Sequence, residues 1–453
     1  MKPMKSQIRS LVLVFGVLAG PVPAAATDLD LWTTETQPDR IATIEYLMNA
    51  FMLLNGGVNV KVTAIDENEI SSRLIRARAK GAMPDIVDAG SEVILSLAEE
   101  LELDTDAASR MIEKIGKGRF FDGALKMLRR PAGEGYFGIP FHGWVQGIWY
   151  RADWFESAGL APPASWKSIL AAARYFTDQK SGRYGILIGT DKDAYAEQVF
   201  THLALSNGAS QFDRDNNLTF DTPQTVATLE FYKQLSRYTP PGPQTWRARD
   251  YYLQGKLAMM FYSTFIMDDL AVASAAANSL EGNRFENLSG ARFDPNLVGN
   301  TKMIPIISSA FPASYGVLNA LGLAKGNGIA RSEAVEKLVT FLFRPDSYIT
   351  WLHMSPGGML PVLKDIAESE NFLRDPGGVF RRYGRDKIGS IVVGLDRIGN
   401  FSRTDGKLAL GAGRIFVERI IPRMIQKTIF EGKPPTEAVS SAKREMKALL
   451  GRN

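Results

Sequence analysis

Residues 29–88 hold the pattern that most restricts the fold of this chain, because short apolar stretches alternate there with stretches of helical periodicity. In the first helical stretch, Ile41, Ile44 and Met48 recur at the spacing of one buried helix face. Three strands are therefore predicted, with a helix between each pair, at residues 29–32, 58–62 and 84–88. Strands joined by helices indicate parallel βαβ units, so an α/β fold is expected.

The loops after the first and third predicted strands carry polar side chains. Ligands of open α/β sheets bind beyond the carboxyl ends of the strands, so these loops are candidate binding loops. Glu35 follows the first strand, and Asp88 and Ser91 follow the third, so we expect all three to contact a ligand. The alternative for Glu35 is a solvated loop acid, and the alternative for Asp88 is a cap on the next helix.

The first 26 residues have the composition of a secretory signal. Lys2, Lys5 and Arg9 form a basic start, an apolar stretch follows at residues 11–19, and small residues reach Ala26. The alternative is a membrane anchor, but the apolar stretch is too short to span ~30 Å of hydrocarbon and prolines interrupt the segment. A signal peptide at residues 1–26, cleaved near Ala26, and a periplasmic location of the mature protein are therefore expected.

Charge, cysteine content and length narrow the class of protein. Removing the signal takes away three basic residues and no acidic ones, so the formal charge falls from +4 to +1. Acids and bases are mixed along the rest of the chain, which argues against a nucleic-acid partner. The absence of cysteine excludes disulfides and a cysteine-linked lipid anchor. Cleavage after residue 26 of 453 leaves 427 residues, enough for two domains of roughly 200 residues each.

Sequence motifs for catalysis or cofactor binding are missing. Histidine occurs only at positions 142, 202 and 353, and without cysteine the usual structural zinc sites are excluded. The motifs H-E-x-x-H, G-x-S-x-G and G-x-x-x-x-G-K-[ST] do not occur. No catalytic residue, metal or cofactor is therefore expected. The paired carboxylates of a glycosidase need no fixed sequence spacing, so a secreted glycosidase stays open as an alternative.

Short motifs in a fixed order give the sequence a resemblance to a known family. Residues 81–87 are similar to a G-x-x-P-D-I strand, and residues 138–140 followed by 148–151 resemble a G-I-P crossing with its next strand. Further similar stretches lie at residues 160–166, 254–259 and 355–361. Through these motifs the chain resembles the extracellular solute-binding proteins of ABC importers, the family that includes maltose-binding protein, over almost the whole mature chain.

The resemblance implies a two-lobed periplasmic binding protein fold, type II-like, with a ligand cleft between the lobes. The implied N-terminal lobe comprises residues 27–140 and 313–354, and the implied C-terminal lobe comprises residues 141–312 and 355–453. Chain crossings are expected near residues 140–143, 311–314 and 355–360. The resemblance also implies a monomer that closes around a small solute, a sugar by family habit, and delivers it to permease subunits in the inner membrane.

The resemblance also places candidate binding residues at the crossings and strand ends. Sugars present apolar ring faces and hydroxyl groups, so a sugar site needs aromatic side chains beside hydrogen-bonding groups. The further candidates for ligand contacts are His142, Trp144, Trp246, Arg247, Ser263, Phe265, Tyr315 and Met359. The alternative for Trp144 is a place in the core, and the alternative for His142 is a hydrogen-bonded hinge residue.

Two departures from the family leave the identity of the ligand open. The family often has a glycine and a tryptophan shortly after the segment matched by residues 254–259, and residues 262–267 lack both. The segment of residues 274–300 is rich in Ala, Asn and Gly and is longer than the corresponding segment usually is in the family. We expect it to form a surface excursion. A polyol, a sugar phosphate or a quaternary amine is an alternative ligand. A phosphate needs clustered Arg or Lys, whereas the candidates mix acids with aromatics, so a neutral sugar or an amine is favoured.

Overall fold

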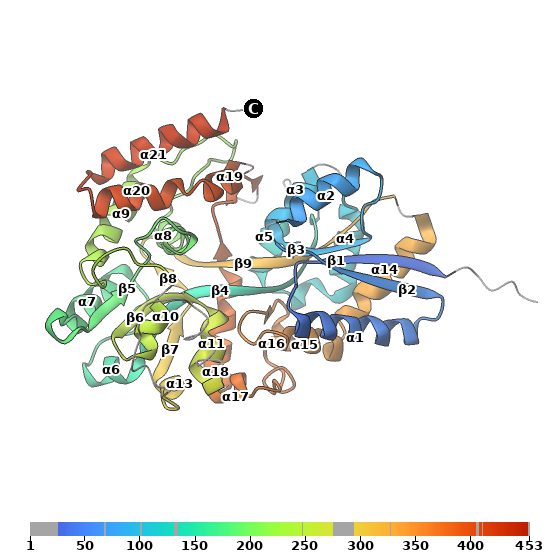
Figure 1. Cartoon of the computed structure of the whole chain (residues 1–453), viewed down its shortest axis with the longest axis horizontal. Coiled ribbons are helices and arrows are strands. Elements are labelled where there is room, and N and C mark those ends of the chain that lie inside the picture. The colour runs from blue at the N-terminus through green and yellow to red at the C-terminus, as the bar shows by residue number, and fades with distance from the viewer. Residues whose placement is uncertain are drawn as a thin grey trace, which may run out of the picture.

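The computed structural model describes residues 26–67, 69–99, 102–130, 135–246, 248–274, 294–326, 328–404, 407–409 and 411–451. The predicted signal peptide up to residue 25, Arg247 and residues 275–293 of the predicted excursion lie outside the described residues. The chain forms two lobes that are joined by strands running through both (Figure 1). The expected two-lobed α/β architecture is confirmed.

One mixed sheet runs through both lobes in the strand order β2-β1-β3-β9-β4-β6-β5. Its strands are β1 Thr27–Thr33, β2 Val58–Ala64, β3 Ile86–Gly90, β4 Ile139–Arg151, β5 Tyr184–Leu187, β6 Leu257–Ser263 and β9 Pro312–Leu323. Four short strands pair beside β4 and β9, namely β7 Thr301–Ile304, β8 Ile307–Ser308, β10 Leu360–Pro361 and β11 Ile398–Gly399. A separate two-stranded sheet pairs β12 Arg403–Thr404 with β13 Lys407–Leu408.

The N-terminal lobe is built on the three strands that the sequence predicts. Strand β1 pairs in parallel with β2, from Thr27 opposite Val58 onward, and with β3, from Leu31 opposite Ile86. The parallel βαβ prediction is therefore confirmed. The carboxyl ends of the three strands lie at one edge of the sheet, so the loops that follow them come together.

Helices cover both faces of these strands, with α1 below and α2 and α3 above in Figure 1. The first five helices are α1 Pro38–Leu54, α2 Ile70–Ala79, α3 Ser91–Glu99, α4 Thr105–Ile115 and α5 Asp122–Leu128. Pro38 occupies the first turn of α1, a position where its missing N–H costs no hydrogen bond. The start of α1 is thereby fixed directly beside the loop that follows β1.

The other helices follow in chain order. Between β4 and β9 lie α6 Ala152–Ser157, α7 Trp166–Phe176, α8 Ala194–Ser206, α9 Pro223–Ser236, α10 Ala248–Leu253, α11 Met267–Ala271 and α13 Leu297–Asn300. After β9 lie α14 Gly328–Leu342, α15 Pro345–Leu352, α16 Lys364–Ala367, α17 Val379–Tyr383, α18 Arg385–Val392, α19 Gly411–Val417, α20 Ile420–Ile429 and α21 Pro435–Leu450. Ser165 is the N-cap of α7 and accepts a hydrogen bond from the backbone N–H of Ser168.

The antiparallel strands β4 and β9 connect the lobes. Strand β9 pairs with the C-terminal segment at Ser314 and Tyr315, and with β3 of the N-terminal lobe from Asn319 onward. Strand β4 pairs with β10 at His142 and Gly143, and with β6 of the C-terminal lobe from Gln146 onward. The partners thus change a few residues after the predicted crossings. The residue bounds of the two lobes stay a prediction.

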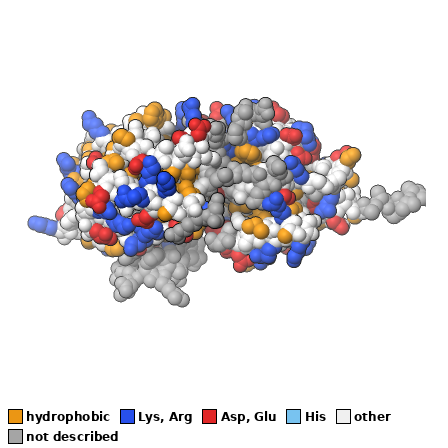
Figure 2. All heavy atoms as spheres, turned by 90° about the horizontal axis from the view of Figure 1, so that it is seen from above, with side chains coloured by type: hydrophobic (Ala, Val, Ile, Leu, Met, Phe, Trp, Pro, Cys, Tyr) orange, Lys and Arg blue, Asp and Glu red, His pale blue; other side chains and the backbone are white. Residues whose placement is uncertain are grey.

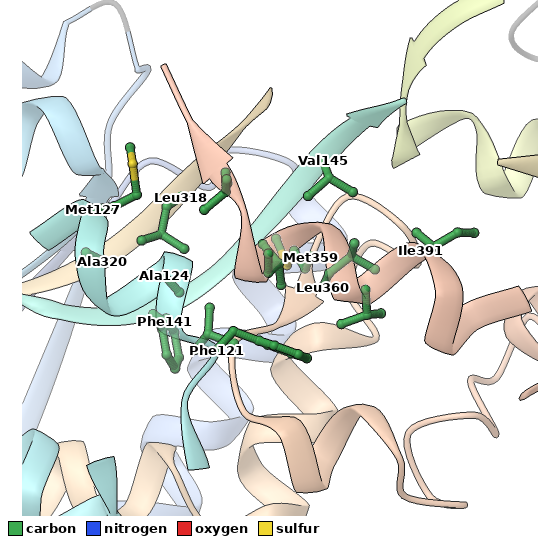
Figure 3. Packing of buried hydrophobic residues seen from close by; sticks show 14 of the residues in the cluster. Phe121, Ala124, Met127, Phe141, Val145, Leu318, Ala320, Met359, Leu360 and Ile391 are labelled. Carbon is green, nitrogen blue, oxygen red and sulfur yellow. The ribbon is translucent and has the colours of Figure 1, made fainter. Parts of the chain in front are cut away.

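Buried apolar side chains fill the junction between the lobes. Figure 3 shows Phe141 and Val145 of β4 beside Leu318 and Ala320 of β9, with Leu360 nearby. All five side chains are buried. The crossing strands are therefore part of a packed core, and they hold the residues beside them in fixed positions.

Two short strands follow one another near residue 305. Strand β7 ends at Ile304, and β8 begins at Ile307. Pro305 lies between them and has no backbone N–H to donate to a ladder, which explains the break. Just before β7, residues 297–300 of the predicted surface excursion form α13.

Charged side chains of both signs are interspersed over the face shown in Figure 2. Hydrophobic side chains lie scattered between them on the same face. Among the described helices, none is long and apolar enough to cross a membrane.

Candidate functional site

Two adjoining hollows lie beside the crossing strands. The first, here called the polar chamber, has a volume of about 670 Å³. Its walls are Thr34, Glu35, Thr36, Gln37, Arg40, Asp66, Glu67, Ile70, Gly90, Glu92, Val93, His142, Trp144, Phe265, Val317, Asn319, Gly358 and Met359. The loops after β1, β2 and β3 therefore form one side of the polar chamber, and residues of the other lobe form the opposite side.

The second hollow, here called the aromatic chamber, has a volume of about 320 Å³. Its walls are Glu92, Glu197, Gln198, Thr201, Gln211, Tyr315, Val317, Asn400, Phe401, Ser402, Ala412, Gly413, Phe416 and Val417. Glu92 and Val317 line both chambers, so the two hollows lie next to each other at these residues.

One face of the crossing strands supplies side chains to both chambers. On β4, His142 and Trp144 are two residues apart, and on β9 the same spacing relates Tyr315, Val317 and Asn319. Side chains two residues apart on a strand point to the same side of a sheet. The register places His142 opposite Asn319 and Trp144 opposite Val317. The side chains on this face of β4 and β9 therefore lie side by side along one wall of the site.

Trp144 stands between two other aromatic rings. Its ring centroid lies 6.2 Å from that of Phe265 in an edge-to-face arrangement, and 6.1 Å from that of Tyr315. Phe265 is 41% exposed, so its ring is open to the chamber. A Cβ at Gly358 would collide with the Phe265 ring, which explains the glycine at this wall. The three rings give a partly open aromatic surface of the kind on which a sugar ring can stack.

A charged group lies at the start of α1. Arg40 forms an ion pair with Glu35, with Nη1 and Oε2 at 2.7 Å, and donates a second hydrogen bond to the hydroxyl of Ser355 at 3.2 Å. Both charged side chains are largely buried. Arg40 therefore holds Glu35 in place and links the N-terminal loops to the turn after α15.

Asp88 lies behind the loop that carries Glu35, and its side chain is fully buried. The Thr33 hydroxyl donates a hydrogen bond to Asp88 Oδ2 at 2.7 Å and accepts one from the backbone N–H of Glu35 at 3.2 Å. Burial, with the nearby Glu35 carboxylate, raises the pKa of Asp88 to about 7. Asp88 thus supports the loop that carries Glu35.

His142 lies at the floor of the polar chamber and is 3% exposed. Burial, with the positive charge of Arg40, lowers the pKa of His142 to about 3, so the imidazole is neutral near pH 7. Its Nε2 atom has no hydrogen-bond partner among the described residues. A neutral imidazole with a buried, unused nitrogen can bind a hydroxyl group.

Glu92 links the two sides of the cleft. Its Oε1 atom accepts a hydrogen bond from Asn400 Nδ2 at 2.8 Å. Glu92 belongs to α3, whereas Asn400 follows β11, more than three hundred residues later in the chain. The carboxylate therefore joins the lobes at the point where the chambers meet.

The structure brings together six of the residues predicted from the sequence. Glu35, His142, Trp144, Phe265 and Met359 line the polar chamber, and Tyr315 lines the aromatic chamber. Asp88, Ser91 and Ser263 are buried and line neither chamber. Trp246 packs on Tyr195 and Tyr262 instead, with ring centroids 4.7 and 5.6 Å away. Arg247 lies outside the described residues. Which of these residues contact a ligand stays a prediction.

Several lining residues were missed by sequence reasoning, and two signals could have found some of them. Asp66 and Glu67 follow β2, so the strand-end rule that selects Glu35 also applies to them. Alternation along β9 from Tyr315 leads to Val317 and Asn319. Residues of α8 and α19 carry no such signal, because tertiary packing alone brings them to the aromatic chamber.

Among the described residues, no group of three or more His, Asp or Glu side chains is placed to hold a metal ion. The polar groups of the chambers are therefore considered as ligand contacts.

Comparison with known proteins identifies relatives over most of the chain. Residues 35–349 match the model of the family described as bacterial extracellular solute-binding protein. A protein of Escherichia coli K12, YcjN, is provisionally named an ABC transporter periplasmic-binding protein. It is 30% identical over 339 residues, which are 75% of this chain and 74% of YcjN.

Solved structures share the fold. The sugar-binding protein MalE from Xanthomonas citri superposes with a TM-score of 0.72 at 16% identity, covering 94% of this chain and 98% of MalE. A solute-binding protein from Agrobacterium radiobacter K84, solved in complex with ribitol, gives a TM-score of 0.66 at 18% identity, covering 94% and 100%. At these identities the likeness concerns the fold alone.

Proposed function

The chain belongs to the bacterial extracellular solute-binding proteins, and from that premise we propose that it captures a sugar or polyol in the cleft between its lobes. The captured solute is then presented to the permease of an ABC importer. Closure of the lobes around the solute gives the permease a shape to recognise.

The observation that carries this proposal is the composition of the polar chamber. Carboxylates, an arginine, a neutral imidazole and an amide surround the space, and the rings of Trp144 and Phe265 stand at its side. Hydroxyl groups both donate and accept hydrogen bonds, so a polyol can use the acids and the arginine together. The aromatic rings offer a flat surface for the apolar side of a sugar.

The charges of the polar chamber argue against a phosphate. Glu35, Asp66, Glu67 and Glu92 line it, whereas Arg40 is the one basic side chain among the described lining residues and is already paired with Glu35. A phosphate would need clustered cations. The acidic balance would also suit an amine, and this makes an amine the second candidate.

The cell location and assembly belong to the same proposal. The composition of residues 1–26 supports export with cleavage near Ala26, and the family supports a periplasmic location. We further propose that the mature protein is a monomer and a receptor without catalytic turnover, as the carbohydrate receptors it resembles are.

A thermal-shift screen of the purified mature protein tests the proposal. Sugars, polyols, amines and phosphates are compared at increasing concentration, and each hit is confirmed by calorimetry and checked for product formation. A sugar or polyol is expected to stabilise the protein by about 2.7 kcal/mol at a hundred times its Kd, with no product. Stabilisation by phosphates alone, or hydrolysis of a glycoside, would contradict the proposal, and stabilisation by amines alone would favour the second candidate.

A further inference from the structure

A short segment between α18 and α19 lies against the N-terminal lobe, although the helices on either side of it are fixed to the C-terminal lobe. Residues 395–403, here called the strap, include β11. Before the strap, Lys387 of α18 donates a hydrogen bond from Nζ to the backbone oxygen of Thr301 in β7 at 3.0 Å. After the strap, Arg414 of α19 donates one to the backbone oxygen of Leu449 in α21 at 2.9 Å.

The first residues of the strap contact α5 of the N-terminal lobe. Asp396 Oδ1 accepts a hydrogen bond at 3.1 Å from the backbone N–H of Asp122, the first residue of α5. A Cβ on Gly123 would lie 2.2 Å from the backbone oxygen of Leu395. Only a residue without a Cβ permits so close an approach, so the backbones of α5 and the strap are in direct contact.

The last residue of the strap also contacts the N-terminal lobe. Arg403 donates a hydrogen bond from Nη1 to the backbone oxygen of Arg129 at 3.1 Å, directly after α5. Its guanidinium carbon lies 5.8 Å from the ring centroid of Phe137, just before β4. This distance is within the range of a cation–π contact, so Arg403 joins the strap to two segments of the N-terminal lobe.

The middle of the strap binds a carboxylate on α3. Asn400 Nδ2 donates a hydrogen bond to Glu92 Oε1 at 2.8 Å, and Ser402 Oγ lies 3.5 Å from the same oxygen. The backbone N–H of Ser402 donates to Asn400 Oδ1 at 3.1 Å, and this directs the amide NH₂ group toward Glu92. Asn400 is 9% exposed, so water competes little for this charge-assisted hydrogen bond.

The strap also forms part of the wall of the aromatic chamber. Asn400, Phe401 and Ser402 line this hollow together with Gln198 and Thr201 of α8 in the C-terminal lobe. The hydrogen bonds of Asp396, Asn400 and Arg403 described above run to the N-terminal lobe. The strap therefore starts and ends at helices of one lobe and is bonded along its length to the other.

We propose that the strap holds the two lobes together by contacts that need no solute, chiefly the hydrogen bond from Asn400 to Glu92. Opening of the cleft at α3 breaks this bond, so the bond favours the closed form before a solute arrives. The inference rests on the proposed function in one respect, namely that the protein is a receptor whose lobes open and close.

Spin labels on the two lobes test this inference without a ligand. The chain has no cysteine, so an introduced pair is labelled selectively. Glu45 on α1 and Glu230 on α9 are exposed, line neither chamber and lie in different lobes. Pulsed electron paramagnetic resonance of the chain with Glu45→Cys and Glu230→Cys measures the distance between the lobes. With the strap intact, one short distance is expected to dominate.

Asn400→Ala, added to the labelled chain, removes the donor of the central hydrogen bond. A longer distance should appear, and the ratio of closed to open molecules should fall about tenfold, as the loss of a hydrogen bond to a charged group would give. Asn59→Ala is the matched control, because Asn59 donates the same kind of bond to Asp28 at 2.8 Å between two strands of one lobe. This control should leave the distances unchanged.

A second variant keeps the size of the side chain. Asn400→Asp places a carboxylate against Glu92, so repulsion replaces attraction and the longer distance should again appear. Thermal unfolding of each variant shows whether it is folded, and if Asn400→Ala folds poorly, Asn400→Asp gives the result.

The outcomes separate this inference from the proposed function. Distances in both Asn400 variants that equal those with the strap intact would overturn the inference, and so would a labelled chain that is mostly open before any change at Asn400. Either result would leave the proposed function standing, because solute binding is measured separately by thermal shift. Failure of every sugar and polyol to stabilise the protein would contradict the proposed function and leave a shift in these distances as support for the strap.

Discussion

The two chambers of the cleft use different physical means to hold a solute, although they share Glu92 and Val317. The polar chamber is lined by loops at the ends of parallel strands, and its groups are charged and paired, as Arg40 and Glu35 are. The aromatic chamber is lined mainly by C-terminal-lobe segments, and three oxygens of its lining residues, Glu197 Oε2, Gln198 Oε1 and Gln211 Oε1, are buried without a hydrogen-bond partner among the described residues. If both chambers hold a solute, we expect the first to orient it by charge and the second to add affinity through apolar contact.

A buried carboxyl group near each chamber sharpens this contrast. Burial raises the pKa of Asp88 to about 7, and burial holds the pKa of Glu197 well above its ordinary value. The Asp88 carboxyl behind the polar chamber therefore changes its protonation near neutral pH, so we expect this side of the cleft to respond to a change of pH in that range.

The largest expected effect is on the pH dependence of stability. A carboxyl whose pKa is higher in the folded than in the unfolded state binds its proton more tightly when folded, so stability falls as pH rises between the two values. For Asp88 that window runs from 3.8 to about 7, and the loss is on the order of 4 kcal/mol at ~1.36 kcal/mol per unit. Asp88→Asn should remove this decline, as measured by urea unfolding across the window.

Two comparisons make the Asp88 result interpretable. Asp268, whose pKa burial raises to about 6, contributes a slope in the same window, so variant and wild type must be compared at each pH. Glu197→Gln should likewise flatten a decline of stability with rising pH, because burial raises the pKa of Glu197 well above its ordinary value. If the stability of Asp88→Asn falls with rising pH as steeply as that of wild type, the decline does not come from the Asp88 carboxyl.

The second effect is the loss of the ring that lies between Phe265 and Tyr315. Trp144 contacts both rings, so Trp144→Ala removes the central part of the stacking surface. Affinity for a confirmed sugar ligand should fall by about 1–3 kcal/mol, measured by calorimetry. Trp154→Ala is the control, since Trp154 is half-buried under the Arg151 guanidinium and lines neither chamber. Unchanged affinity in Trp144→Ala would remove this residue from the site.

The smallest effect concerns the carboxylate that belongs to both chambers. Glu92→Gln keeps the shape of the side chain but replaces a charge-assisted hydrogen bond to Asn400 with a neutral one. Affinity for a confirmed sugar ligand should fall by about 1 kcal/mol, measured by calorimetry. Glu156→Gln, at an exposed ion pair with Lys302, should have no effect. Unchanged affinity in Glu92→Gln would show that the charge of Glu92 does not contribute to binding.

The sequence predicts the polar chamber better than the aromatic one, for a physical reason. Strand-end rules and short motifs are local, so they lead to Glu35, Trp144, Phe265 and other residues near β1, β4 and β6. Glu197 and Phe401 reach the aromatic chamber from α8 and from the segment after β11, and this proximity depends on how the C-terminal helices pack. No periodicity within either segment reveals it.

Some residues predicted to contact a ligand are instead buried in the core, and a sequence does not show which side chains will be buried in this way. Trp246 precedes a helix, as a ligand-binding residue could, yet its ring packs on Tyr195 and Tyr262. Asp88 was predicted at the end of a strand, but β3 continues to Gly90 and the Asp88 side chain turns inward to Thr33. In both cases the residue type was right for a binding site, and the direction of the side chain was decided by tertiary packing.

Strands β4 and β9 belong to both lobes, and this sharing couples how the lobes lose their structure. Each lobe uses one half of the same two strands to complete its sheet, so melting one lobe removes hydrogen-bonded neighbours from the other. The buried junction around Phe141 and Leu318 would be exposed at the same moment (Figure 3). We therefore expect unfolding of the mature chain to be a single cooperative event rather than two independent ones, and we expect a ligand bound in the cleft to raise the stability of the whole molecule.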